Sequence, residues 1–244
     1  MYLYTVTIKE QKEFWLKFHR FQMRYELMYT PKINRALRAQ VRAYIDSGTL
    51  MQVNSAGLYL VLLDLYKTVG SIWARHTNPG LHKKEGGQMG FSERIVSFMQ
   101  QYFSIDLLND AENITQTTIQ TIQRVLSESA LQGWSFDEIV KRLVSPDLTA
   151  KRARLIARTE TVGAANAGSL LNAKATGLQP NKIWISARDK RTRPHHREVN
   201  QMVVPFDGKF TVGESLMDFP GDKAGGAAEV CNCRCAVAFI PVEK

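Results

Sequence analysis

Two clusters of chemically reactive side chains occur in the last third of this 244-residue chain. The first, Asp189-Lys-Arg-Thr-Arg-Pro-His-His196, brings a carboxylate, two arginines and two histidines together within a short segment. The second, Cys231-Asn-Cys-Arg-Cys235, holds all three cysteines of the chain. Side chains of these types bind metals, bind anions and act as general bases or nucleophiles. Nothing before Lys151 has a comparable density of them.

Zinc binding is one interpretation of the histidine and the cysteines. A site made of His196, Cys231, Cys233 and Cys235 has four donors, which is the number that tetrahedral zinc requires. The Cys-x-Cys-x-Cys spacing, however, is not the Cys-x₂-Cys spacing typical of structural zinc. The alternative is that the cysteines lie on a strand, face the same side and pack as small apolar residues. In that case His196 is hydrogen-bonded to the backbone or to Asp189.

Catalysis is a second interpretation of the same residues. His196 with Asp189 could act as a general base, and Arg191 and Arg193 could hold a phosphate, as in a nuclease or transferase. Cys233 with His196 could act as a nucleophile pair. The sequence has no acidic pair suited to Mg²⁺ and no recognised glycine-rich phosphate loop, so we expect a protein that is not an enzyme. The polar residues are then a network that fixes the fold of a small module. Its expected members are Glu160, Asp189 and His196.

The elements before these clusters are predicted to be helical. Apolar residues recur at helical spacing from Ile8 to Tyr29, and Pro31 is predicted to begin a second helix that ends near Asp46. Ser135 is expected to cap a short helix. The other expected helices are 53–75, 92–103, 107–131, 136–144 and 149–175. The last of these is rich in alanine and glycine, which lets another element approach closely.

The segments after residue 180 are predicted to form a sheet. Lys182–Ser186 alternates as a strand, and Met202–Pro205 with Lys209–Val212 is expected to form a hairpin around Phe206-Asp-Gly208. Cys235–Ile240 is expected to be the last, buried strand. The predicted fold class is therefore α+β. A helical N-terminal region (1–147, with a possible break at 77–90) precedes a module (148–244) of helix packed on a short antiparallel sheet.

Positive charge is concentrated in two parts of the chain. The formal net charge is +9, and basic residues gather between residues 1 and 42 and between residues 151 and 197. Such blocks are either solvated helix faces or surfaces for a polyanion. Clustered arginines near a helix N-terminus oppose the helix dipole, so we expect anionic partners for them, either Glu160 and Asp189 or external phosphates. The residues chosen for anion or DNA contact are Arg152, Arg154, Arg158, Arg191 and Arg193.

Composition also indicates where the protein acts. No apolar run reaches the ~18–20 residues of a membrane span, and the start of the chain lacks a basic stretch followed by an apolar one. Three cysteines within five residues do not suit a disulfide framework and fit a reducing compartment. We therefore expect no membrane contact, and a protein of the cytosol or of a particle interior.

Five short motifs occur in the same order as in a known family. They are Arg154–Thr161, Lys182–Trp184, Asp189–His196, Phe219–Asp222 and Asn232–Cys235. Each motif is weak alone, but the ordered set resembles the phage Mu F-like minor head proteins, also called head morphogenesis proteins. The resemblance covers about the last 90 residues. The chain differs from the family pattern at His195, Gln201 and the additional Cys231.

The resemblance implies a structural component of a tailed phage head, located inside the virion near the portal and present in the host cytoplasm during assembly. Its implied partners are portal and coat or scaffold proteins and non-specifically bound double-stranded DNA. The two basic blocks suit such an environment, because packaged DNA is a dense polyanion. Two alternatives are a nucleic-acid-processing enzyme that uses His196 and Asp189, and a DNA-binding accessory protein unrelated to a capsid.

Overall fold

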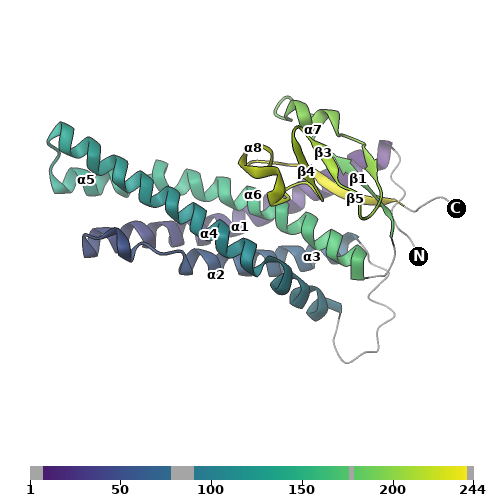
Figure 1. Cartoon of the computed structure of the whole chain (residues 1–244), viewed down its shortest axis with the longest axis horizontal. Coiled ribbons are helices and arrows are strands. Elements are labelled where there is room, and N and C mark those ends of the chain that lie inside the picture. The colour runs from purple at the N-terminus through teal and green to yellow at the C-terminus, as the bar shows by residue number, and fades with distance from the viewer. Residues whose placement is uncertain (1–7, 78–90, 176–178, 241–244) are drawn as a thin grey trace. The chain divides into compact units, whose positions relative to one another are not determined.

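The computed structural model describes residues 8–77, 91–175 and 179–240, and Figure 1 shows a helical first part followed by short strands. This confirms the predicted α+β class. The helices are α1 (Ile8–Ser47), α2 (Ala56–Leu65), α3 (Ser71–Thr77), α4 (Phe91–Gln132), α5 (Phe136–Leu143), α6 (Pro146–Ala175), α7 (Pro194–Glu198) and α8 (Gly226–Val230), with a π-helical turn η2 (Tyr66–Gly70). The strands are β1 (Asn181–Ile185), β2 (Val203–Val204), β3 (Phe210–Val212), β4 (Ser215–Met217) and β5 (Ala236–Ile240). None of the helices described is both long and apolar enough for a transmembrane span.

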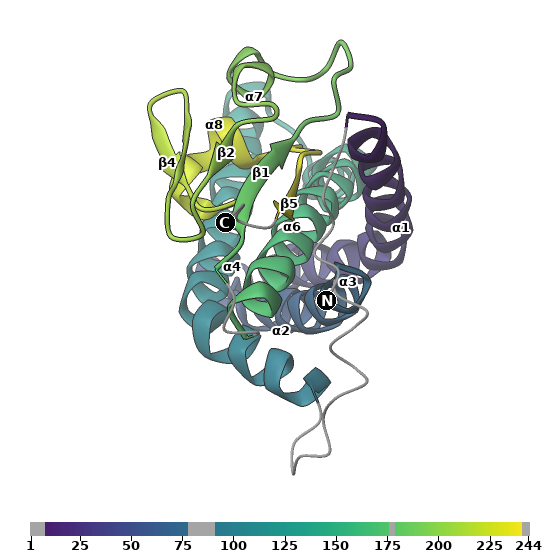
Figure 2. The same cartoon turned by 90° about the vertical axis from the view of Figure 1, so that its right-hand side faces the viewer.

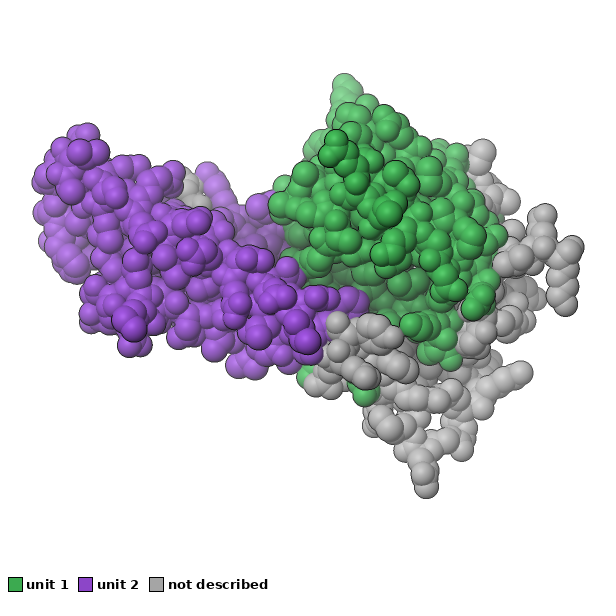
Figure 3. All heavy atoms as spheres, viewed as in Figure 1, with its two compact units in different colours: residues 1–25, 65–101, 158–244 green, residues 26–64, 102–157 purple. Residues whose placement is uncertain are grey.

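The chain forms two compact units, each assembled from separate segments (Figure 3). Unit 1 comprises residues 1–25, 65–101 and 158–244, and unit 2 comprises residues 26–64 and 102–157. The long helices α1, α4 and α6 each contribute residues to both units. The predicted boundary near residue 147 stays a prediction, and the sheet and both reactive clusters belong to unit 1.

Helix α1 is continuous over 40 residues, so the predicted start of a second helix at Pro31 is wrong. Proline lacks an N–H, which leaves the carbonyl of Leu27 without its helical partner. Leu27 is 68% exposed, so this part of the helix faces water, which can satisfy the carbonyl. Tyr29 and Ile33, on either side of Pro31, are fully buried. Their packing within unit 2 offsets the cost of about 3 kcal/mol for an interior proline.

The remaining helices follow the predicted segments with one merger. The two helices expected over 92–103 and 107–131 are one helix, α4, because no glycine or proline interrupts the chain and Leu107 and Ala111 continue the buried face. The third predicted helix corresponds to α2, η2 and α3, and the N–H of Ala56 at its start donates to Asn54 Oδ1 (3.2 Å). The predicted cap of α5 is confirmed, because the N–H of Glu138 donates to Ser135 Oγ.

The sheet of unit 1 has the order β2-β1-β5, and both pairings are antiparallel. The predicted hairpin of 202–205 with 209–212 is wrong: β2 pairs with β1, and β3 pairs with β4 in a separate hairpin. The predicted turn does form, since the N–H of Gly208 donates to the carbonyl of Pro205. The chain leaves β2 there because Pro205 has no N–H to extend a ladder.

The two faces of this sheet are covered by different elements of unit 1. On one face, Ile183, Ile185 and Ala238 pack against Phe14 and Trp15 from the start of α1. Trp184 is fully buried and meets Phe210 of β3 edge to face, with ring centroids 5.3 Å apart. Figure 2 shows β5 running beside the later part of α6. The sheet is therefore enclosed by α1, α6 and the β3–β4 hairpin.

The small residues of α6 permit a close approach, as predicted. A Cβ at Gly168 would lie 2.3 Å from the carbonyl oxygen of Gly70 in η2 and 2.7 Å from two further backbone atoms of that residue. Backbone atoms cannot move aside as a flexible side chain can, so any side chain here must separate α6 from η2.

We predict that Gly168→Ala lowers the free energy of unfolding by about 1–3 kcal/mol, because its methyl group overlaps the backbone of Gly70. The matched control is Gly57→Ala in α2, where a Cβ meets nothing within 4 Å. That change should raise stability by about 0.5 kcal/mol, because it restricts the unfolded chain. Urea unfolding followed by circular dichroism measures both. Equal stability of the two variants would contradict the close approach.

Candidate functional site

The three cysteines lie in a loop between α8 and β5. The alternative that they share one strand face is wrong, because β5 begins only at Ala236 and the N–H of Cys231 still bonds to the last turn of α8. Asn232 has a left-handed backbone (φ 59°), which turns the chain between Cys231 and Cys233. Cys233 and Cys235 are each 2% exposed, whereas Cys231 is partly exposed. The turn therefore leaves Cys231 outside the buried pair formed by Cys233 and Cys235.

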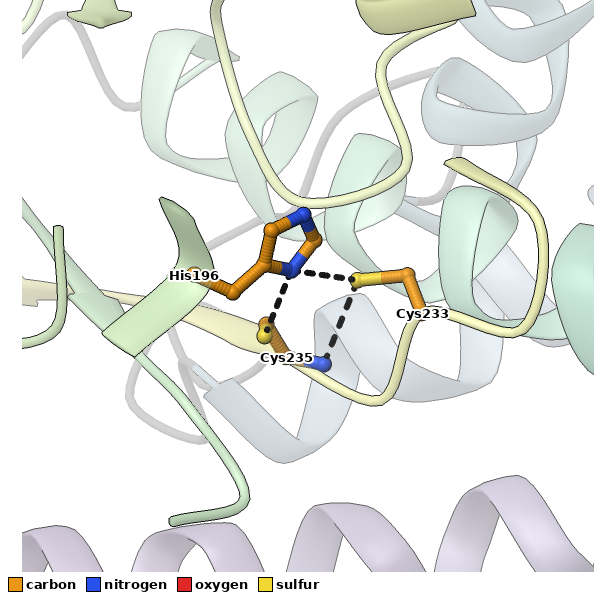
Figure 4. Close-up of side chains that lie close together, drawn as sticks. All are labelled: His196, Cys233 and Cys235. Carbon is orange, nitrogen blue, oxygen red and sulfur yellow. Dashed lines mark hydrogen bonds between the residues drawn. The ribbon is translucent and has the colours of Figure 1, made fainter. Parts of the chain in front are cut away.

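His196 reaches the two buried cysteines from the short helix α7 (Figure 4). Pro194 starts this helix, and its fixed φ favours a helical first turn. The Nδ1 atom of His196 lies 3.4 Å from Cys235 Sγ and 3.7 Å from Cys233 Sγ. These three donor atoms all lie within 4.8 Å of one another, and Cys231 is not part of the group. Three of the four predicted zinc ligands are therefore brought together.

Glu229 of α8 holds the other side of the imidazole. Its Oε2 lies 2.9 Å from His196 Nε2, and its Oε1 lies 3.0 Å from His195 Nδ1. Burial acts to raise the pKa of Glu229, but the hydrogen bonds and charges of the two histidines outweigh it and lower that pKa. The hydrogen bond with Glu229 in turn raises the pKa of His195. No local pattern indicates this contact, because Glu229 is 33 residues from His196 in the chain.

The two buried thiols have different proton affinities. The hydrogen bond from Cys235, together with the hydrogen bond and charge of His196, lowers the pKa of Cys233. Burial and the neighbouring sulfur of Cys233 raise the pKa of Cys235. The backbone N–H of Cys235 also donates to Cys233 Sγ (3.4 Å). Cys233 is thus the more acidic of the pair.

Asp189 forms a separate cluster with Arg234. The guanidinium of Arg234 donates to both carboxylate oxygens at 2.6 and 2.7 Å, a bidentate ion pair. The same carboxylate accepts from the N–H of Arg191 and the hydroxyl of Thr192, which fixes the turn before α7. Arg234 holds the pKa of Asp189 well below its usual range. The structure therefore gives Asp189 and His196 different partners.

Glu160 of α6, the third residue of the predicted polar network, belongs to a third cluster. It is 4% exposed, and Lys223 Nζ contacts both of its carboxylate oxygens at 2.9 and 2.8 Å. The hydroxyl of Tyr66 donates to Glu160 at 3.0 Å. Glu160, Asp189 and His196 thus each fix a different pair of segments within unit 1.

The arginines expected to contact anions differ in how exposed they are. In unit 2, Arg152 donates to Thr118 Oγ1 and the carbonyl of Ile114, and burial lowers its pKa. Arg154 is 64% exposed and pairs with Glu26 at 2.9 Å. Arg154 therefore remains accessible to an external anion despite its partner, whereas Arg152 is largely used inside the fold.

The other three expected arginines lie in unit 1. Arg158 donates to Asn232 Oδ1 (3.2 Å), and Arg193 donates to the carbonyl of Cys231, so both support the cysteine loop. Arg191 is 72% exposed and lies 3.7 Å from Asp189. Of these three, Arg191 is the most accessible to an external anion.

The contacts that link Cys233, His196 and Glu229 occur in two kinds of site, a thiol-enzyme active site and a metal site. A thiol, an imidazole and a carboxylate in a row form the nucleophile, base and orienting group of a thiol enzyme. The same row is a pair of metal-binding donors followed by a carboxylate that orients the histidine. Cys233, Cys235 and His196 are all buried, and a nucleophilic cysteine needs access to its substrate. A hollow of about 430 Å³ nearby is lined instead by residues 186, 188–190, 197 and 200.

Comparison with known proteins finds one family whose model matches part of the chain. Residues 120–238 match the model of the family described as Phage Mu protein F like protein. The chain is 26% identical over 166 residues to Minor head protein GP7 of Bacillus phage SPP1, a match that covers 64% of this chain and 53% of that protein. These findings confirm the resemblance inferred from the five motifs.

A second relative has a different name. The chain is 30% identical over 133 residues to NAD(+)--arginine ADP-ribosyltransferase EFV of Enterococcus faecalis (strain ATCC 700802 / V583). This match covers 53% of the chain and 26% of that protein, so most of the transferase lies outside it. No solved structure matches the chain significantly.

We predict that Asp189→Asn destabilises the protein by about 1–3 kcal/mol at neutral pH, because Arg234 is 9% exposed and loses its charged partner. The pKa of Asp189 is lowered by folding, so its contribution is complete above the unfolded value of about 3.9 and is lost as the pH falls below it. The stability difference from wild type should therefore shrink below about pH 4.

Thermal unfolding across pH 3–8 measures this effect. Asp106→Asn, at an exposed position of α4, is the matched control and should follow the wild-type curve. A constant difference between Asp189→Asn and wild type at all pH values would show that the ion pair is not its source.

Proposed function

We propose that this chain, whose residues 120–238 belong to the family of Phage Mu protein F like proteins, is a structural minor head protein that acts in head morphogenesis. The observation that carries the proposal is the family match, supported by the similarity to Minor head protein GP7. The chain spans about half the length of that relative. Location inside the head near the portal, with portal and coat or scaffold proteins as partners, is part of the proposal.

The protein acts without catalysis in this proposal. The thiols beside His196 are buried, and Asp189 is held in an ion pair with Arg234 away from the histidine's own partners. These contacts favour a role in holding the fold over the alternative of a nucleic-acid-processing enzyme that uses His196 and Asp189. The similarity to the transferase covers 26% of that protein and supplies no further argument for activity.

Contact with packaged DNA is the second part of the proposal, and exposed positive charge on α1 supports it. Lys17, Arg20 and Arg24 are spaced by three and four residues, so they share one side of the helix, and all three are exposed. We call them the basic face of α1. Arg35, Arg38 and Arg42 repeat the spacing in unit 2 and are also exposed. Such residues can neutralise phosphates without regard to base sequence.

We predict that the protein binds duplex DNA without sequence preference and that log affinity falls linearly with log salt. Replacing Lys17, Arg20 and Arg24 by glutamine should reduce the slope by up to about 3, because each phosphate contact contributes about 0.9. Fluorescence anisotropy with two unrelated duplexes at several salt concentrations measures it.

The control for that experiment removes three exposed charges from elsewhere, in Lys141→Gln, Lys190→Gln and Lys209→Gln. If the basic face of α1 is the contact, this variant keeps the wild-type slope. A second variant, Arg154→Gln with Arg191→Gln, tests the two most accessible of the arginines expected from the sequence. Equal losses in all variants would show that only net charge matters, and no binding at low salt would exclude the DNA contact.

The head role predicts that the protein is incorporated during phage assembly. In particles of the phage that encodes it, quantitative mass spectrometry of purified heads should detect the chain at far fewer copies than the coat protein. Virions emptied of DNA and untreated virions should be compared to learn whether it remains in the head. Its absence from both procapsids and mature heads would overturn the structural role, whatever the DNA-binding result.

A further inference from the structure

The donors around Cys233 have the separations that a metal ion requires. A tetrahedral zinc ion with Zn–S near 2.3 Å and Zn–N near 2.0–2.1 Å places a nitrogen and a sulfur ligand about 3.6 Å apart. His196 Nδ1 lies 3.4 Å from one sulfur and 3.7 Å from the other. Figure 4 shows the imidazole nitrogen facing both sulfurs. All three donor atoms lie within 4.8 Å of one another.

The orientation of the His196 ring also fits a metal ligand. A carboxylate only accepts hydrogen bonds, so the 2.9 Å contact with Glu229 places the ring proton on Nε2. In the neutral ring the lone pair is then on Nδ1, which faces the sulfurs. Metal-binding histidines characteristically donate their other ring nitrogen to a carboxylate or carbonyl, which sets the tautomer and raises ligand basicity.

The segments that carry the donors are held by contacts from distant parts of unit 1. The N–H of Asn232 donates to Thr159 Oγ1 of α6, and Trp15 Nε1 of α1 donates to the carbonyl of Arg234. The indole of Trp184 meets the His196 ring edge to face, with centroids 5.4 Å apart. These contacts fix the loop and the ring before any ion binds, which is a requirement of a selective site.

We propose that His196, Cys233 and Cys235 form a three-donor site for Zn²⁺, with Glu229 as the residue that orients the histidine. Two thiolates and an imidazole are a donor set that zinc prefers over magnesium or calcium. Each thiol releases its proton when it coordinates the ion, and one coordination position remains for a ligand outside this set. Cys231, which the sequence suggested as the fourth ligand, lies outside the cluster.

The test is the metal content of the full-length chain, purified without chelators, loaded with zinc chloride and desalted. Mass spectrometry of the elements should find about one zinc per chain. Cys233→Ser and Cys235→Ser should lose it, whereas the matched control Cys231→Ser should retain it. Glu229→Gln keeps a hydrogen-bonding side chain and should bind zinc at least tenfold more weakly in a competition with a chromophoric chelator.

Cobalt substitution provides a readout that does not depend on variants folding. Co²⁺ bound by two thiolates should give thiolate-to-metal charge transfer and the strong visible absorption of a tetrahedral ion, and excess zinc should remove both. Three results would overturn the proposal. They are a wild-type chain without zinc after loading, equal loss of zinc in Cys231→Ser, and an intact mass two hydrogens lower that reveals a Cys233–Cys235 disulfide. None of these results depends on DNA binding or on incorporation into heads.

Discussion

The buried amide of Asn166 in α6 is the interaction on which the organisation of unit 1 depends. Asn166 is fully buried, and its Nδ2 donates to the carbonyls of Pro220 (2.8 Å) and Cys235 (3.1 Å). Its Oδ1 accepts from the N–H of Val237 (2.9 Å). One side chain thus satisfies backbone groups of the β4–α8 connection and of the free edge of β5. Each of these groups would cost about 1–3 kcal/mol if buried without a partner.

This amide acts together with the close packing of small residues on α6. Gly221 has φ 91°, and a Cβ there would lie 2.9 Å from Gly163 of α6. Asp222 then fixes the next turn by accepting from the N–H groups of Asp218 and Ala224. The motif Phe219-Pro-Gly-Asp222, one of the five that carry the family resemblance, therefore has a structural cause. It lets the chain cross α6 in contact with its backbone and return toward the cysteine loop.

The parts of the fold that the sequence predicted are those governed by local rules. The cap at Ser135, the small face of α6 and the strands β1 and β5 follow from side-chain periodicity and turn chemistry in single segments. The helix start at Pro31 and the pairing partner of β2 are predicted wrongly, because burial and pairing with distant segments outweigh local preference.

In the candidate site, the sequence indicates the reactive residues but not the partners that hold them. His196, Cys233 and Cys235 were identified by residue type, but their hydrogen-bonding partner Glu229 was not. Arg234 belongs to the motif Asn232–Cys235, yet its pairing with Asp189 joins positions 45 residues apart and has no local signature. Residue type can suggest chemistry from sequence, whereas the partner that sets a tautomer or a pKa is determined by the fold.

The contribution of each arginine to the charge of the surface also depends on its partners in the fold. Every arginine between residues 151 and 197 contributes equally to the net charge of the sequence. In the structure, these arginines differ in the groups that they contact. Glu26 offsets the charge of Arg154, whereas Arg152 and Arg193 donate to neutral oxygens. Donation to a carbonyl, a hydroxyl or an amide fixes a guanidinium in place without neutralising it. Such arginines still contribute to the long-range potential that attracts a polyanion, although they are poorly placed to touch it.

In the proposed contact with DNA, the residues that touch phosphates are exposed side chains such as those on α1. Long-range attraction and direct contact would then depend on different residues. The first depends on the whole charge distribution, and the second depends on a few lysines and arginines that remain in water.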